Sequence, residues 1–170
     1  YDFYNIFRDK GNLTHAKKQQ KLSHNYLINK EFINYNSKVL LNAEFYNQIF
    51  NTEDKEIEKN KYVSGTYYRF FPILGITTKT PFKLKNYNEN LLITPKINLT
   101  ITPGISNSSY LSNEDSTNND LNLENIYRLN RYSGNDKMDN SKRITYGIDV
   151  NLKNINTSFV QFYEFTDNSN

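Results

Sequence analysis

The 170-residue sequence contains no cysteine, which excludes thiolate metal sites and cysteine nucleophiles. It has two histidines, His15 and His24, and neither belongs to a recognisable Ser-His-Asp arrangement or has a convincing third metal ligand. The sequence also lacks a phosphate-binding glycine loop. We therefore predict a protein that is not an enzyme and that has no cofactor.

Long hydrophobic runs are also missing. No stretch approaches the roughly 18 apolar residues that a membrane-spanning helix needs. The chain begins at Tyr1 without an initiator methionine or an apolar leader, so we expect a processed product or an excerpt of a longer chain.

The sequence also lacks a strong excess of either charge, because the net charge is only +3 and the lysines are spread along the chain. Nucleic-acid binding usually requires a concentrated basic stripe, so we do not expect a nucleic-acid partner. Lys17, Lys18 and Lys21 form a small cluster, which we expect to lie in a solvated loop.

What is abundant is aromatic residues, at 15% of the chain, and hydrophobic residues at every second position. The clearest example is residues 91–103, where apolar and polar side chains alternate and predict a β-strand with one dry and one wet face. The apolar positions include Ile97, Leu99 and Ile101. The polar positions include Lys96, Asn98 and Thr100.

Residues 143–153 repeat this alternation. Their apolar face contains Ile144, Tyr146, Ile148 and Val150. Their polar face contains Arg143, Asp149, Asn151 and Lys153. Residues 37–50 follow the same pattern, and weaker strands are predicted at residues 1–8, 22–34, 62–82 and 157–167. Within 62–82, Pro72 cannot donate to a ladder and should mark a bulge or a locally unpaired position.

The connections between these strands alternate in length. Residues 35–36, 83–90 and 154–156 form short to moderate turns, whereas residues 9–21, 51–61 and 104–142 form long polar loops. Outer-membrane β-barrels have short periplasmic turns and long external loops. We therefore predict an all-β fold of antiparallel up-and-down strands, about seven in number, forming part of a large transmembrane β-barrel that is open as an isolated piece.

In this interpretation residues 1–170 form one partial barrel domain, whose apolar positions face lipid and whose polar positions face the lumen. The long segment at about 104–142 either is an extracellular loop or folds into the lumen. The sequence leaves both possibilities open.

A run of short motifs in residues 69–147 carries a family resemblance. The motifs are Arg69-Phe-Phe-Pro72, Thr80-Pro81-Phe82, Leu91 to Pro95, Asn113-Glu114-Asp115-Ser116, the run Asn125 to Lys137, and Arg143 to Gly147. In their order and spacing they resemble the LptD (OstA) family of lipopolysaccharide-assembly proteins. The run Asn130-Arg131-Tyr132-Ser133-Gly134-Asn135-Asp136 is similar to that family's N-R-F-S-G-x-D pattern. Residues 1–60 match only in their alternation.

The resemblance implies an internal segment of the family's C-terminal barrel, in the outer membrane of a Gram-negative bacterium. The whole protein would place lipopolysaccharide in the outer leaflet. Its implied partners are lipopolysaccharide, outer-membrane lipid, an LptE-type lipoprotein plug and the periplasmic Lpt bridge. This segment would contain neither the lateral gate nor the periplasmic domain.

The resemblance also directs attention to the long segment. Its candidate residues are Asn113, Glu114, Asp115, Ser116, Asn130, Arg131, Ser133, Gly134 and Asp136. We expect charge-assisted bonds from Arg131 and Asp136 to hold this segment, with Gly134 supplying an unusual backbone conformation. We expect Asn113 and Asp115 to form side-chain turns.

Four alternatives remain open from the sequence. Arg128, Arg131 or Lys137 could contact lipid A phosphates, and oxygen atoms of residues 113–116 and Asp120 could bind calcium. The chain could also belong to another outer-membrane barrel, such as a porin or receptor. The last alternative is a soluble β-sandwich binding module, whose apolar faces would pack against each other.

Overall fold

The computed structural model describes residues 1–84, 91–117, 121–152 and 154–166, and these residues contain eight strands. The strands are β1 (Asp2–Phe7), β2 (Lys18–Asn34), β3 (Ser37–Glu58), β4 (Lys61–Lys79), β5 (Phe82–Leu84), β6 (Leu91–Ile101), β7 (Lys142–Leu152) and β8 (Ile155–Glu164). In this described part of the chain, no helix is long and apolar enough to span a bilayer.

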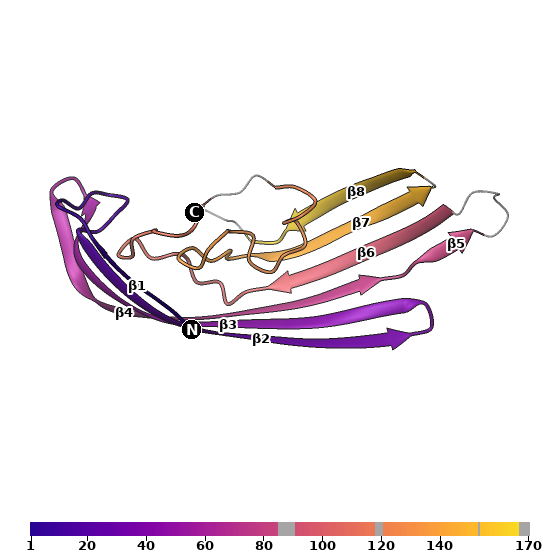
Figure 1. The fold of residues 1–170 in the computed structure, drawn as a ribbon, viewed down its shortest axis with the longest axis horizontal. Helices are drawn as coiled ribbons and strands as arrows, with labels where there is room; N and C mark the ends of the chain where they lie inside the picture. The colour runs from indigo at the N-terminus through magenta and orange to yellow at the C-terminus, as the bar shows by residue number, and fades with distance from the viewer. Residues whose placement is uncertain (85–90, 118–120, 153, 167–170) are drawn as a thin grey trace.

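All eight strands belong to one antiparallel sheet in the order β1-β2-β3-β4-β6-β7-β8 (Figure 1). Strand β5 occupies no separate position, because it pairs with β6 on the same side as β4 does. The break between β4 and β5 includes Pro81, which has no backbone N–H to donate. The sheet therefore has seven positions, which confirms the prediction of about seven up-and-down strands.

The sheet is open within the described residues, because β1 and β8 each have one paired neighbour. The β-sandwich alternative is wrong for this part of the chain, since a sandwich needs a second sheet to cover the apolar face of the first. The sheet instead curls around a concave side, as Figure 1 shows.

The prediction of a loop at residues 51–61 is wrong. Strand β3 continues to Glu58 and pairs with β4 as far as Glu58 and Lys61, so the two strands have 22 and 19 residues. Two register shifts occur in this extension, between Thr52 and Lys55 and between Glu56 and Glu58. The charged composition suggested a loop, but polar side chains do not prevent strand pairing, and two of them, Thr52 and Lys55, are buried.

Other boundaries differ by a few residues from the predictions. The loop predicted at 9–21 ends earlier, because β2 begins at Lys18, and β8 begins two residues before 157. Pro72 stands opposite Phe45 without a register shift, so no bulge occurs there. The ladder between β4 and β6 begins at Leu74, so the described β4 pairs only with β3 at Pro72. The turn predicted at 83–90 begins later, because residues 83 and 84 belong to β5, and its residues 85–90 lie outside the described residues, as do Lys153 and residue 167.

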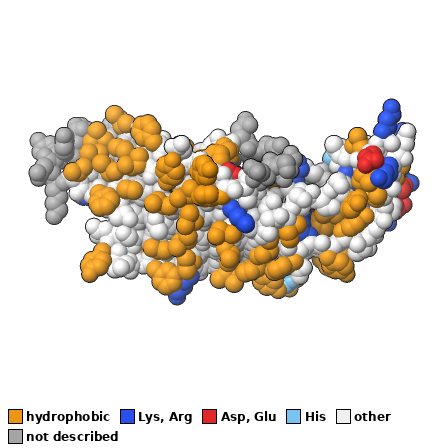
Figure 2. Space-filling view, turned by 180° about the vertical axis from the view of Figure 1, so that it is seen from behind, with side chains coloured by type: hydrophobic (Ala, Val, Ile, Leu, Met, Phe, Trp, Pro, Cys, Tyr) orange, Lys and Arg blue, Asp and Glu red, His pale blue; other side chains and the backbone are white. Residues whose placement is uncertain are grey.

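The two faces of the sheet differ in their environment. We call the convex face the outer face and the concave face the inner face. Large hydrophobic side chains on the outer face are exposed, among them Leu74 at 52% and Phe159 at 65%. Figure 2 shows hydrophobic side chains spread over one side of the molecule, with charged side chains gathered at one end. On the inner face, polar side chains such as Gln48 and Asn98 are fully buried.

The two-residue turn between β2 and β3 contains a strained position. Tyr35 has φ of 51°, a left-handed conformation that costs a residue with a Cβ about 1 to 2 kcal/mol. Replacing Tyr35 with glycine should therefore raise the free energy of unfolding by about 1 kcal/mol. The midpoint of urea unfolding of the full-length protein measures this change. Asn36→Gly is the matched control, because Asn36 is not among the residues with positive φ, and an equal gain there would contradict the explanation.

Candidate functional site

Between β6 and β7, the described residues 102–117 and 121–141 cross the inner face of the sheet (Figure 1). We call these residues the strap. It contains one isolated bridge, between Thr117 and Ser133, and is otherwise irregular within its described residues. We call the sheet the wall. Side chains of the wall have to bind many of the backbone groups of the strap, since buried N–H and C=O groups need hydrogen-bond partners.

Two aspartates join the strap to itself. The carboxylate of Asp136 accepts hydrogen bonds from the backbone N–H groups of Glu114 and Asp115, at 2.7 and 3.1 Å. In return, the carboxylate of Asp115 accepts from the backbone N–H groups of Asn135 and Asp136, at 3.0 and 2.7 Å. Each carboxylate thus fixes the backbone of the other's segment. We call this reciprocal arrangement the aspartate clasp.

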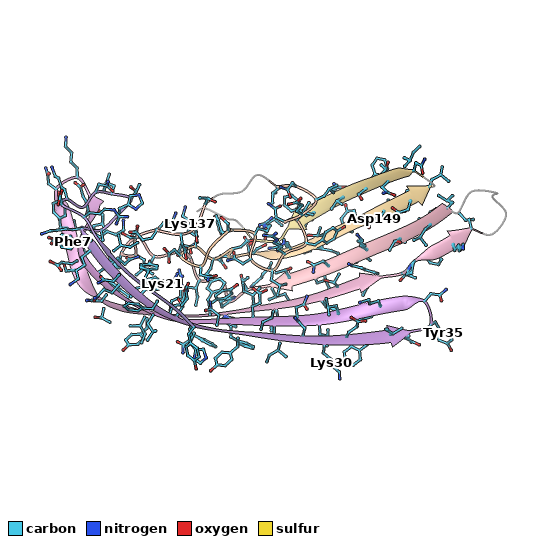
Figure 3. The ribbon with its side chains drawn as sticks, viewed as in Figure 1. Phe7, Lys21, Lys30, Tyr35, Lys137 and Asp149 are labelled. Carbon is cyan, nitrogen blue, oxygen red and sulfur yellow. The ribbon has the colours of Figure 1, made fainter. Side chains whose placement is uncertain are left out.

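Lys21 on β2 connects the aspartate clasp to the wall. Its ammonium donates to Asp136 Oδ1 at 2.7 Å and to Asp115 Oδ2 at 2.9 Å, and its side chain is fully buried (Figure 3). Tyr4 on β1 donates from its hydroxyl to both oxygens of Asp136, at 3.1 and 3.2 Å. The prediction that Lys21 lies in a solvated loop is therefore wrong. Its charge is stabilised because two carboxylates lie within hydrogen-bonding distance of the buried ammonium.

Arg69 on β4 supports the same region through the backbone. Its guanidinium donates to the carbonyl oxygens of Asn135 and Asp136, both at 2.6 Å. Gln48 on β3 positions Arg69 by accepting from its Nε at 2.8 Å, and it also donates to the carbonyl of Asn135 at 3.0 Å. These bonds satisfy carbonyl groups that the irregular strap cannot pair internally.

The beginning of the strap is fixed to β1 and β2 in a similar way. Arg8 forms a two-point ion pair with Glu114, with Nη1 to Oε1 at 3.0 Å. The side-chain amide of Gln19 both donates to the carbonyl and accepts from the N–H of Ser112, at 3.0 and 2.9 Å. A glutamine amide can pair with a peptide group in this way because it presents the same donor and acceptor.

A second charged cluster fixes the end of the strap. Arg131 donates to both carboxylate oxygens of Asp139, at 2.5 and 3.0 Å, and lies 3.4 Å from Glu164 on β8. Arg143 on β7 donates to the same Asp139 at 2.9 Å and to the carbonyl of Leu129 at 3.2 Å. Arg131 and Asp136 thus each make charge-assisted bonds, but with different partners and not with each other.

The strap also has a small apolar core against the wall. Leu129 and Met138 of the strap are buried with Phe71 and Ile73 of β4. Gly75 leaves room for this contact, because a Cβ there would lie 2.3 Å from Cδ2 of Leu129. The strap is therefore held by side-chain packing as well as by charge.

The structure places the predicted positions of β6 and β7 on opposite faces. Asn98, Thr100 and Arg143 are buried on the inner face, and Lys96 pairs with Asp149 there. Asn151 lies on the same face and is half-buried. The apolar positions lie on the outer face. Ile97, Leu99, Ile101 and Tyr146 are exposed there, and Ile144, Ile148 and Val150 are half-buried.

The remaining motif residues shape the strap itself. Gly134 has φ of 78°, and a Cβ there would meet the carbonyl of Asp115 at 2.3 Å. Asn113 forms the predicted side-chain turn by accepting from the N–H of Ser116 at 3.0 Å. Asn130 accepts from the N–H of Asp139 at 3.1 Å, and Ser133 shares a hydrogen bond of 2.6 Å with Thr117. The carboxylate of Asp115 accepts from the N–H of Asp136 across the aspartate clasp and from the neighbouring Ser116 hydroxyl at 2.9 Å, and these bonds are not those of the predicted side-chain turn.

The calcium alternative loses its ligands to the aspartate clasp. Asp115 Oδ1 and the hydroxyl of Ser116 accept from strap N–H groups, Asp115 Oδ2 accepts from Lys21, and Asp120 lies outside the described residues. Among the residues that the structure describes, no group of three or more His, Cys, Asp or Glu side chains could hold a metal ion.

The sequence did not identify the wall residues Tyr4, Lys21, Gln48 and Arg69 as partners of the strap. One signal was available for three of them. Lys21, Gln48 and Arg69 each directly precede an apolar residue that points to the outer face. These residues are Leu22, Ile49 and Phe70, so the three polar side chains have to point to the inner face. Polar residues on the buried side of a strand need partners, and only a long segment could supply them.

Asp136 offers a direct test of the aspartate clasp. Asp136→Asn should lower the free energy of unfolding by about 2 to 3 kcal/mol, because Lys21 and two backbone N–H groups lose a charged acceptor in a buried site. Protease cleavage within the strap should become faster. Asp9→Asn removes the same charge from an exposed position and should change neither quantity. Equal cleavage rates in both variants would contradict the role of the clasp.

Asp115 makes the strap sensitive to acid. Burial acts to raise the pKa of Asp115, but hydrogen bonds from Lys21 and Ser116 and the positive charge of Lys21 hold it below its ordinary value. Its stabilising effect is therefore complete above the unfolded pKa of about 3.9 and is lost as pH falls through the lower folded pKa. The hydrogen-exchange protection factors of the strap, which are corrected for the intrinsic pH dependence of amide exchange, should fall in that acidic window. Asp115→Asn should exchange faster at neutral pH and show a smaller change on acidification, and an unchanged pH dependence would count against this explanation.

Comparison with known proteins identifies the chain. A search of curated proteins gives no significant match. The family model described as LptD, LPS transport system D, matches residues 3–167. This match covers both the sheet and the strap, including the N-terminal strands for which motif evidence was absent. The chain therefore belongs to the LptD family of lipopolysaccharide-transport proteins.

Proposed function

We propose that this chain forms part of the wall of an outer-membrane β-barrel that places lipopolysaccharide in the outer leaflet of a Gram-negative bacterium. The observation that carries the proposal is the family match over nearly the whole chain, on a sheet whose exposed outer face is apolar. The function is physical and involves no catalysis. The outer face contacts lipid, and the inner face lines a hydrated lumen that contains the strap.

The open edges of the sheet support this arrangement. An unpaired strand edge in hydrocarbon leaves backbone N–H and C=O groups without partners, at several kcal/mol each. Strands β1 and β8 each have one neighbour in the described residues. We infer that further strands of the full-length protein pair with them and complete the barrel. An LptE-type plug and the periplasmic Lpt bridge would act through that full-length protein.

The long connection between β6 and β7 and the extension of β3 and β4 support one orientation, although β3 and β4 are themselves joined by a two-residue turn. The two-residue turn at 35–36 and the turn between β7 and β8 lie at one end of the sheet, and the strap and the β3–β4 hairpin begin at the other. Short turns of outer-membrane barrels face the periplasm. Strands β3 and β4 exceed the roughly 9 to 11 residues that cross a bilayer, so their hairpin would extend beyond the membrane on the external side.

The strap would help to shape the lumen through which lipopolysaccharide passes. Arg131 is engaged with Asp139 and Glu164, which leaves it less suited to bind a lipid A phosphate than an uncommitted cation would be. We therefore assign Arg131 the role of holding the strap in place. The inner polar positions of β6 and β7 would face the lumen directly or through the strap.

The two faces should respond differently to charge. Leu99→Arg should destabilise the folded barrel in a bilayer by about 2 to 4 kcal/mol, because it places a cation on the lipid face. Asn29→Arg is the matched control on the inner face. Ile28→Arg, one residue from Asn29 on the outer face of the same strand, lies at nearly the same depth as Asn29 and should show the same loss as Leu99→Arg. Folding efficiency into vesicles measures these changes, and a loss for Asn29→Arg equal to that for Ile28→Arg would exclude the proposed orientation.

The transport function is tested by depletion of the full-length protein in its native host. Loss of the protein should abolish the arrival of newly made lipopolysaccharide at the cell surface, measured by surface labelling, while synthesis continues. The wild-type gene supplied in trans should restore labelling. Normal surface labelling after depletion would reject the transport function and favour another barrel, such as a porin or receptor.

A further inference from the structure

A groove crosses the outer face of the sheet, on the side opposite the strap. It has a volume of about 520 Å³ and is lined almost entirely by hydrophobic side chains of β2, β3, β4 and β6. Its walls include Ile28, Leu41, Leu74, Ile76, Leu99 and Ile101. The strap and its charged clusters have no part in it, so it is separate from the site described above.

The groove exists because a small residue interrupts a row of large ones. Register pairing aligns Ile28, Ala43 and Leu74 on neighbouring strands, and Leu74 in turn pairs with Ile101. Ala43 contributes only a methyl group between Ile28 and Leu74. The next row, which contains Leu41 and Ile76, extends the depression towards the periplasmic turn.

One cation lies at the end of this apolar groove. Lys30 lines the groove on the outer face, beside Leu41 (Figure 3). In the described part of the chain no carboxylate is recorded in an ion pair with Lys30, and its Nζ lies 5.8 Å from the ring centroid of Phe32. Phe32 is two residues nearer to the turn at Tyr35, so the ammonium extends towards that end of the strand. A lysine on a lipid-facing surface places its charge at the headgroup level in this way.

We propose that this groove binds one acyl chain of an anionic glycerophospholipid, with the headgroup phosphate bound by Lys30. The assignment rests on the proposed membrane location of the outer face. The groove is apolar, as an acyl chain requires, and its one charged residue has the sign that attracts a phosphate. The lipid would occupy the periplasmic leaflet, because Lys30 extends towards the short turn.

The experiment uses the full-length protein folded in vesicles of phosphatidylcholine. The vesicles contain a small fraction of either phosphatidylglycerol or phosphatidylcholine that carries a photoactivatable diazirine on one acyl chain. After irradiation, cross-linked peptides are mapped by mass spectrometry. We expect the phosphatidylglycerol probe to label peptides containing the groove residues in preference to the rest of the outer face.

Two variants test the two parts of the site. Ala43→Phe fills the groove and should abolish the preferential labelling. Lys30→Gln should reduce the preference for phosphatidylglycerol over phosphatidylcholine about two- to five-fold, the range expected for a partly exposed ion pair. The matched controls are Asn47→Phe on β3 and Lys18→Gln on β2, at outer-face positions of the same two strands but outside the groove. They should leave labelling unchanged.

The outcomes separate this inference from the proposed function. Uniform labelling of the outer face that neither variant changes would overturn the lipid site and leave the membrane location intact. Labelling of the inner face in place of the outer face would overturn both. If Ala43→Phe fails to fold, as judged by the mobility of unheated protein in gel electrophoresis, Lys30→Gln still decides whether the phosphate contact exists.

Discussion

The alternation of side chains along each strand is the constraint on which the whole structure depends. Successive residues of a strand point to opposite faces, so a shift of one residue in register would exchange the two faces completely. Here one face is apolar and exposed, and the other is polar and covered by the strap. The register of the whole sheet is therefore fixed by two environments that cannot be exchanged without burying charge or exposing hydrocarbon to water.

The inner face meets its own requirement with charge pairs. Lys21 and Arg143 are among the most deeply buried side chains of the chain, and each faces a carboxylate of the strap. Burying such charges is unfavourable unless geometry and hydrogen bonding are nearly complete. For Lys21 the aspartate clasp provides this completeness, because Asp115 and Asp136 use their remaining oxygens to bind backbone N–H groups. The same contacts that neutralise the wall therefore also determine the path of an otherwise irregular segment.

Much of the sheet could be predicted from the sequence because period-two alternation is a local signal. Residues 91–103 and 143–153 correspond closely to β6 and β7, and the motifs around Arg131 and Gly134 identified the family that the comparison confirms. The extension of β3 and β4 was missed because its charged residues resemble a loop. The pairing of Asp136 with Lys21 was not predictable, since those residues are 115 positions apart. Pattern gives the face on which a residue lies, whereas partners across the inner face depend on the curvature of the sheet and on the path of the strap.

The central claim is that the outer face contacts lipid and the inner face contacts water. Because these 170 residues contain no cysteine, single cysteines that carry nitroxide labels can be introduced at Tyr146 on the outer face and at Thr94 on the inner face of the full-length protein in vesicles, once any cysteines elsewhere in that protein are replaced. Collisions with oxygen, which dissolves in lipid, and with a water-soluble nickel chelate can then be measured by electron paramagnetic resonance. The account predicts that oxygen dominates at position 146 and the chelate at position 94. The opposite pattern, or free access of the chelate to both positions, would contradict it.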